Sequence, residues 1–396
     1  MIIKKVALVL MLFGTLLYSG EKNENDITEL ERIIKIVSGS DRVDMLNNLS
    51  KLYLTKSVEK SIKYANLALD LSREIPYPKG IVSSQIRIGC SFLAMKKPDE
   101  SIAYFKKALG NSSKLKKYDL VLSDLWWHYG EAENQLKNYK KAIKNFKYAF
   151  KINKKNNRNC HSDTSEIQNG IGTAYYCLKK FRKAIKHFKK AVNIAKSTYG
   201  NGHFSTIQKY NNLGLALSYK KKYRLAEASF RTALKGKLEL ANNKYIPHIS
   251  SIYDNLAWSL FRQKRFQDAL DNYDQAIVYS KKRFGEESFN VAFILNNKAR
   301  VLIEFGRVDE ALDILLNLQT FFQENDNENG VNIAHVWITI GLAYEKKTKN
   351  KKAISFYSKA FKRFSTKLGP DSPDSTKVMD RIKKLMMNVI FKRYKN

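Results

Sequence analysis

Residues 210–234 read YNNLGLALSYKKKYRLAEASFRTAL, which is two amphipathic segments joined by a basic turn at residues 220–222. Small residues stand at Gly214, Ala226 and Ala233, where an amphipathic helix usually carries large apolar side chains. A glycine inside a helix costs roughly 1 kcal/mol relative to alanine. We therefore expect these small residues to mark a close contact between two helices.

The same positions recur along the chain about every 42 residues, which indicates a repeat architecture. Each copy has a small residue, then a second small residue twelve positions later, then a large residue four positions further on. The first position is Gly89, Gly130, Gly172, Gly214, Ala257, Ala299 and Gly341, and the large one is Phe105, Phe146, Phe188, Phe230, Tyr273, Leu315 and Tyr357. A weaker copy lies upstream at residues 49–68. Each copy predicts a helical hairpin, which buries both of its faces only when hairpins stack.

This pattern resembles the tetratricopeptide repeat, in the class of about 42 residues that is found in kinesin light chains. The linkers STYGNGHFSTIQKYNNLG and KRFGEESFNVAFILNNKA agree with that class, since an aromatic residue and a glycine precede a polar bend. The resemblance covers about residues 42–373 and implies an all-α, right-handed superhelical solenoid of about eight helix-turn-helix repeats. The chain departs from the family pattern in lacking its last proline and in carrying Leu315 and Leu318 in the seventh repeat.

The ends of the chain are expected to flank this solenoid. Residues 1–20 place Lys4 and Lys5 before an apolar run at 6–17, which is typical of a signal peptide and too short for a membrane span of about 20 residues. We therefore predict export to the periplasm, envelope or medium, with an uncleaved N-terminal anchor as the alternative. Residues 21–41 are expected to form a leader or helix. Residues 374–396 are expected to form a capping helix with an apolar stripe at Ile382, Leu385, Met386, Val389 and Ile390.

The composition favours a helical protein, since 396 residues include only 18 glycines and six prolines. The net charge of +34 indicates either an anionic partner or a genome-wide bias toward lysine, and the even spread of lysine favours the second explanation. The three cysteines form no disulfide framework. Cys90 and Cys177 are expected to be small core or groove residues, and the adjacent Cys160 and His161 are a weak metal signal.

A candidate partner-binding surface follows the first helix of each repeat, because first helices line the concave side of such a solenoid. Residues at offsets 0, 3 and 7 share one face of a helix. Counted from two residues before the small position, the polar and aromatic candidates at these offsets in repeats five to seven include Asn212, Tyr219, Asn255, Trp258, Arg262, Asn297 and Arg300. The resemblance implies that the asparagines hold the backbone of an extended peptide, while tryptophan and arginine are common interface anchors. In the alternative interpretation, the asparagines hydrogen-bond neighbouring helices and Trp258 packs between repeats.

The predicted inner face is not uniformly basic, because the third repeat places Trp127, His128 and Glu131 there. The fourth repeat adds Glu166, Asn169 and Tyr176. A uniformly basic lining would be expected of a nucleic-acid groove, and the excess lysine lies mostly in turns and second helices.

The sequence contains no phosphate-binding loop, metalloprotease helix, paired CxxC motif or nucleophile elbow. We therefore predict no catalytic residue, metal or cofactor. The predicted function is that of a non-enzymatic scaffold which binds an extended protein or peptide segment. The alternatives are a sensor module that acts with a separate signalling partner, a basic nucleic-acid-binding repeat, and a structural role in the envelope.

Overall fold

The computed structural model describes residues 24–158, 162–239, 248–325 and 330–394 of the chain. The predicted signal peptide, Cys160 and His161 lie outside these residues. The chain divides into two compact units, Met1–Ala216 and Leu217–Asn396. All of the regular structure in the described ranges is helical, and no helix there is long and apolar enough to cross a bilayer.

The first unit contains the N-terminal helices. They are α2 (Glu24–Ile33), α3 (Gly39–Tyr53), α4 (Val58–Glu74), α5 (Pro78–Ala94), α6 (Pro98–Gly110), the short 3₁₀ turn η1 (Asn111–Lys114), α7 (Leu120–Gln135), α8 (Tyr139–Lys155), α9 (Ser162–Cys177) and α10 (Phe181–Tyr199). Helix α11 (Phe204–Tyr219) crosses the boundary into the second unit.

The second unit contains the remaining helices. They are α12 (Tyr223–Glu239), α13 (Ile249–Phe261), α14 (Phe266–Phe284), α15 (Phe289–Phe305), α16 (Val308–Asn325), α17 (Asn332–Lys346), α18 (Asn350–Leu368) and α19 (Pro373–Tyr394). Within the described ranges, α3 to α18 form the eight helix pairs that the repeat predicts, so the predicted all-α stack of hairpins is confirmed.

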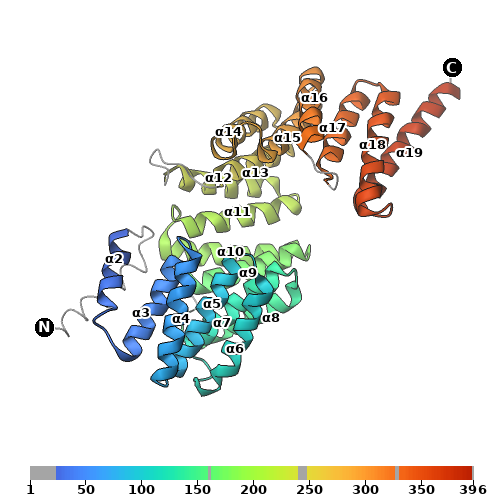
Figure 1. Cartoon of the computed structure of the whole chain (residues 1–396). Helices are drawn as coiled ribbons and strands as arrows, with labels where there is room; N and C mark the ends of the chain where they lie inside the picture. Colours follow the sequence, from blue (N-terminus) through green and yellow to red (C-terminus); the bar gives the residue numbers. More distant parts are fainter. Residues whose placement is uncertain (1–23, 159–161, 240–247, 326–329, 395–396) are drawn as a thin grey trace. The chain divides into compact units, whose positions relative to one another are not determined.

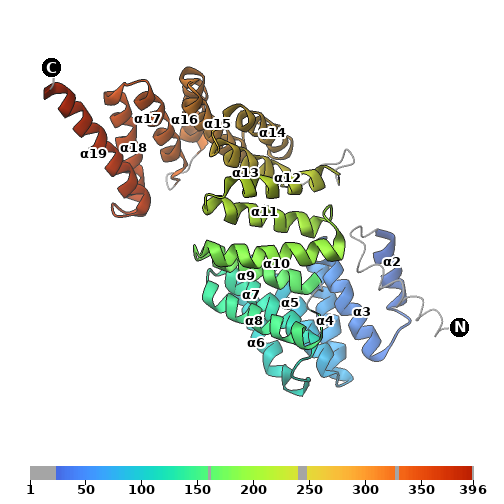
Figure 2. The same cartoon turned by 180° about the vertical axis from the view of Figure 1, so that it is seen from behind.

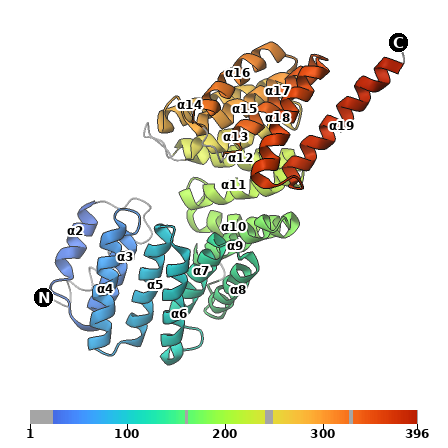
Figure 3. The same cartoon turned by 45° about the vertical axis from the view of Figure 1, so that its right-hand side comes forward.

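Each helix from α3 to α10, and from α12 to α19, contacts the next one along the chain (Figure 1). Figure 3 shows α4, α5 and α6 side by side, and Figure 2 shows α18 beside α19. The first helices of successive pairs also contact one another, namely α3 with α5, α5 with α7 and α7 with α9, and likewise α13 with α15 and α15 with α17. Within each unit, the first helices therefore form a layer of their own, as the repeat requires.

The glycines inside the helices lie where an aromatic ring of the partner helix rests on the backbone. A Cβ atom added at Gly130 would lie 2.6 Å from Phe146, and one added at Gly341 would lie 2.6 Å from Tyr357. Both rings are fully buried. The predicted close contact is confirmed at these pairs, because the packing of a buried ring offsets the intrinsic cost of a helical glycine.

A residue with left-handed backbone conformation ends the first helix of seven pairs, always seven positions after the small residue. These residues are Lys96, Lys137, Lys179, Lys221, Lys264, Gly306 and Thr348. Their backbone N–H groups and those of the next residue bond back to the last carbonyls of the helix, as Lys137 does to Asn134 and Asn138 does to Glu133. The basic turn of the opening stretch is thus a helix cap whose backbone conformation, rather than its charge, recurs in these seven pairs.

Both ends of the described chain cover an apolar face. At the N-terminal end, Ile27 and Leu30 of α2 lie in one buried cluster with Leu46 and Leu49 of α3. At the C-terminal end, Val378, Ile382 and Leu385 of α19 join a buried cluster that also contains Tyr357, Ala360 and Phe364 of α18. A terminal helix of this kind shields the last repeat from water.

Two expectations from the sequence were wrong. Met386 does not belong to the apolar stripe of α19, since it is 49% exposed, and the side chains of Val389 and Ile390 lie outside the described residues. Cys177 is exposed rather than a core or groove residue, because it is the last residue of α9, whereas Cys90 is buried as expected.

Candidate functional site

Two of the predicted asparagines donate hydrogen bonds to the neighbouring first helix. Asn212 Nδ2 donates to Asn169 Oδ1 at 3.0 Å in the first unit, and Asn297 Nδ2 donates to Asp254 Oδ1 at 3.2 Å in the second. Asn255 is partly buried on α13. Each amide has two N–H groups and one carbonyl oxygen, so Asn212 and Asn297 keep polar atoms with which to contact a partner.

The predicted aromatic and arginine residues of α13 and α15 come together in the second unit. The guanidinium carbon of Arg262 lies 5.5 Å from the centre of the Trp258 ring, and that of Arg300 lies 5.3 Å from it. Arg262 also lies 5.1 Å from the ring of Tyr223. Both arginines are therefore within cation–π range of one indole. We call Trp258, Arg262 and Arg300 the arginine–tryptophan cluster.

The arginine–tryptophan cluster carries positive charge that the fold does not neutralise. Within the described ranges, no carboxylate lies within 4.0 Å of Arg262 or Arg300, whereas Arg381 pairs with Glu345 at 2.9 Å. Burial lowers the pKa of Arg300 from its ordinary value, and repulsion by Arg262 and Arg381 lowers it further, against opposing effects of Tyr273 and Glu304. An anionic group that approached these two guanidinium groups would relieve this repulsion.

Tyr219, the remaining predicted residue, is 61% exposed at the end of α11. It lies in the second unit, and Asn212 of the same helix lies in the first. The predicted set of seven residues is therefore divided between the two units.

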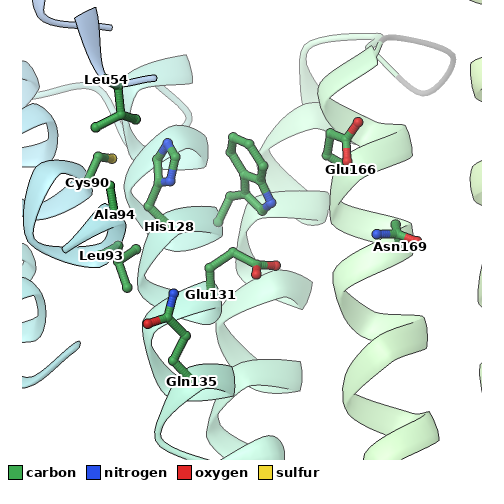
Figure 4. Close-up of a pocket in the computed structure, with 10 residues that line it drawn as sticks. Leu54, Cys90, Leu93, Ala94, His128, Glu131, Gln135, Glu166 and Asn169 are labelled. Carbon is green, nitrogen blue, oxygen red and sulfur yellow. The ribbon is translucent and has the colours of Figure 1, made fainter. Parts of the chain in front are cut away.

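A cavity of about 370 Å³ opens on the first helices of the first unit (Figure 4). This volume lies within the range of small-ligand pockets. Apolar side chains from α5 and the end of α3 form one wall, and polar side chains of α7 and α9 form the other. The lining residues are Leu54, Cys90, Leu93, Ala94, Trp127, His128, Glu131, Gln135, Glu166 and Asn169.

An ionic network lies beside this cavity on α5 and α7. Asp124 pairs with Arg87 and with His128, whose Nε2 lies 3.3 Å from the Asp124 carboxylate. Burial opposes the charge of Asp124, but the attraction of Arg87 and His128 outweighs it and holds the pKa of that carboxyl well below its usual range. Burial also opposes the charge of His128, but interactions with Cys90 and Asp124 raise its pKa to about 9.

The two glutamates of the cavity have different surroundings. Glu166 Oε1 accepts hydrogen bonds from Lys209 Nζ at 2.6 Å and from Ser205 Oγ at 2.8 Å. Glu131 has no hydrogen-bond or ion-pair partner among the described residues. Burial raises the pKa of Glu131 to about 7. Attraction to His128 lowers this pKa, and repulsion by Glu166 raises it further.

The residues that line this cavity were not predicted as site residues, although the offset rule applied to the second and third repeats selects half of them. The offsets of 0, 3 and 7 that select the arginine–tryptophan cluster select Arg87, Cys90 and Ala94 in the second repeat. In the third repeat they select His128, Glu131 and Gln135, and five of these six residues line the cavity. The sequence signal for this site is the presence of charged residues at helix positions that face other helices.

A metal centre is not formed by the residues described, since nowhere among them do three His, Cys, Asp or Glu side chains gather in a way that could hold an ion. The arrangements in the two units are suited to binding charged groups next to apolar surface.

Two family models described as tetratricopeptide repeat match the chain. One matches residues 121–197, 163–239 and 248–317, where the first two segments begin one repeat apart, and the other matches 82–114 and 334–365. No curated protein matches the chain.

Solved structures resemble the chain at low sequence identity. A signal transduction ATPase with numerous domains and a tetratricopeptide repeat sensor, from Pyrococcus horikoshii, is 14% identical with a TM-score of 0.66, and the match covers 92% of this chain and 52% of that one. The apo quorum sensor NprR from B. thuringiensis is 13% identical with a TM-score of 0.57, over 87% and 99% of the two chains. BtubC (BKLC) from P. vanneervenii is 19% identical with a TM-score of 0.51, over 57% and 92%. At sequence identities this low, the similarity to these structures shows a shared fold alone.

Proposed function

Because this chain belongs to the tetratricopeptide repeat family, we propose that it is a non-enzymatic scaffold which binds an extended protein or peptide segment on its first helices. The layer of contacting first helices offers such a segment a continuous surface within each unit. Neighbouring helices pack roughly 8–10 Å apart, and three extended residues span about 10 Å. A segment that crossed the layer would therefore present a side chain to every helix.

The arginine–tryptophan cluster is the observation that carries this proposal. Its two guanidinium groups lack carboxylate partners in the described part of the chain, and they stand beside an indole that is only partly buried. A partner segment with a carboxylate next to an apolar side chain would complete both interactions, because guanidinium forms bidentate bonds with carboxylate and the indole buries apolar surface. The second N–H group and the carbonyl oxygen of the Asn297 amide are suited to the backbone of that segment.

Selection of peptides from a displayed random library on the full chain tests the proposal. Selected peptides should contain Asp or Glu next to an apolar residue. Their affinity, measured by fluorescence anisotropy, should fall about tenfold or more in Arg300→Gln, since a charge-assisted bond is lost.

The matched control for that experiment is Arg307→Gln, which removes the same charge from an exposed position of the second unit. It should leave the affinity nearly unchanged and so account for non-specific attraction by the net charge of +34. Peptides that lack acidic residues, or that bind Arg300→Gln as well as the wild type, would refute the proposal. A nucleic-acid ligand would instead show affinity that falls by powers of ten over a few-fold rise in salt.

A regulatory input module that acts with a separate signalling partner is the second candidate. It is supported by the likeness in fold to the quorum sensor NprR and to the repeat sensor from Pyrococcus horikoshii. A sensor must change conformation when it binds its ligand, because only a difference between two states can be read by a partner. Small-angle scattering with and without a selected peptide separates this candidate from a rigid scaffold.

We also propose that residues 1–20 direct export of the chain. The support is the pattern of two lysines followed by a short apolar run. Cell fractionation with N-terminal sequencing of the mature chain tests it, and a cytoplasmic chain that retains Met1 would contradict it.

A further inference from the structure

We propose that the cavity of the first unit binds a primary ammonium group, which Glu131 neutralises next to the indole of Trp127. This site uses other residues and the opposite charge from the arginine–tryptophan cluster, and it does not rest on the function proposed above.

The first argument is the carboxylate of Glu131, which is half-buried, lines the cavity and has no partner among the described residues. Figure 4 shows this carboxylate directed toward α9, the helix that carries Glu166 and Asn169. A Cβ atom added at Gly170 of α9 would lie 2.9 Å from Glu131 Oε1, so the glycine leaves room for the carboxylate at this point. A partly desolvated carboxylate without a partner is destabilised, and a bound cation would offset that cost.

The second argument is that the other charges of the cavity are already paired. His128 of α7 is paired with Asp124, which also pairs with Arg87 of α5. Glu166 of α9 is paired with Lys209 of α11. The hydrogen bonds that Glu166 accepts from Ser205 and Lys209 both use Oε1, which leaves Oε2 as a second acceptor near the cavity. Cys90 is the remaining titratable group of the lining. Glu131 is therefore the charged group of the lining that lacks a direct ionic partner among the described residues.

The third argument is that the rest of the lining fits an alkylammonium better than a metal ion. Ca²⁺ takes six to eight oxygen ligands and Mg²⁺ demands octahedral geometry, whereas this cavity offers two carboxylates and two amides. The indole of Trp127 attracts organic cations, and Leu54, Leu93 and Ala94 form an apolar wall for a methylene chain. The ligand chemistry is thus a primary ammonium on an alkyl chain, as in a lysine side chain of a partner or in a free diamine.

The test is isothermal titration of the full chain with three probes, namely the peptide acetyl-Gly-Gly-Lys-Gly-Gly-amide, its norleucine analogue, and cadaverine. We expect the lysine peptide or cadaverine to bind, and the norleucine analogue, which lacks the charge, to bind about tenfold more weakly or not at all. Binding of the lysine peptide alone identifies a side chain of a partner as the source, and binding of cadaverine alone identifies a free diamine.

Glu131→Gln preserves the shape of the side chain and should weaken binding about tenfold or more. Glu100→Gln, the same charge change on an exposed residue of α6, should have no effect. Arg300→Gln, which alters the arginine–tryptophan cluster, should also leave the binding of these probes unchanged. The two proposals can therefore fail independently of one another.

Proton exchange gives a second readout that a merely structural role would not produce. Since the pKa of Glu131 is about 7 and a cation favours its ionised form, wild-type binding should tighten as the pH rises from 6 to 8 and should release protons to the buffer. Glu131→Gln should lose both effects. The proposal would be overturned if neither the lysine peptide nor cadaverine bound at roughly 10 mM, or if the wild type and Glu131→Gln bound equally well.

Discussion

Replacement of Gly130 by alanine should destabilise the first unit, although alanine is the better helix former. The ring of Phe146 on α8 is fully buried between two glycines of neighbouring first helices. A Cβ atom at Gly130 would lie 2.6 Å from Phe146 Cε1, and one at Gly170 would lie 2.6 Å from Phe146 Cζ. The ring cannot move away from α7 without approaching α9, so the helices must separate.

The expected magnitude follows from two opposing terms. Overpacking of a buried site costs about 1–3 kcal/mol, and exchange of glycine for alanine in a helix contributes about 1 kcal/mol in the other direction. The net effect is a loss of about 1 kcal/mol, which lowers the melting temperature of a unit of this size by about 2–4 °C. Gly110 has no atom within 4 Å of the position of an added Cβ, so Gly110→Ala should instead stabilise by about 0.4–1 kcal/mol.

Thermal unfolding followed by circular dichroism measures both variants, and the double variant Gly130→Ala with Phe146→Leu isolates the contact. Without the ring, Gly130→Ala should become neutral or stabilising, which corresponds to a coupling energy of about 0.5–3 kcal/mol. If Gly130→Ala raises the melting temperature as Gly110→Ala does, then close contact with Phe146 is not the reason for glycine at this position.

Two further predictions concern the pH dependence of stability in the first unit. His128 has a raised pKa of about 9, so its stabilising effect should be complete below about pH 6.5 and should disappear as the pH rises through 9. The melting temperature should fall over this interval in the wild type, and a fall of equal size in His128→Gln would contradict the assignment. Glu131 has a carboxyl pKa raised to about 7, so stability should be lost as the pH rises from about 4.3 to 7. Glu131→Gln should therefore be more stable than the wild type at pH 8, by at most about 4 kcal/mol, and equal to it at pH 4. Equal urea midpoints at pH 8 would show that the carboxylate carries no such penalty.

The hairpin repeat was predictable because its determinants are local. The small residue and the large residue that contacts it are sixteen positions apart, as in Gly130 and Phe146. The large residue is aromatic in six of the seven clear copies, and it is Leu315 in the other. The left-handed turn residue was not predicted, because lysine carries no conformational preference that would identify Lys96 or Lys137 as a helix cap. Glycine occupies this position only at Gly306.

The candidate sites were predictable in position but not in chemistry. The rule of offsets placed Trp258, Arg262 and Arg300 on one surface, and the same rule selects half of the residues that line the cavity. Which charges neutralise one another depends on contacts between helices about 40 residues apart, such as Lys209 with Glu166. No local pattern indicates that Glu131 lacks such a partner while Glu166 has one.

The sequence by itself therefore determined the family, the hairpins and the surface formed by the first helices, because these follow from periodic burial within each repeat. Only the tertiary structure decided that Asn212 and Asn297 pair with neighbouring helices, that Arg262 and Arg300 share one indole, and that Glu131 is half-buried without a partner among the described residues. The physical reason is that charge compensation and desolvation depend on the distances between repeats, and those distances are set by the packing of whole helices rather than by the residues of any one of them.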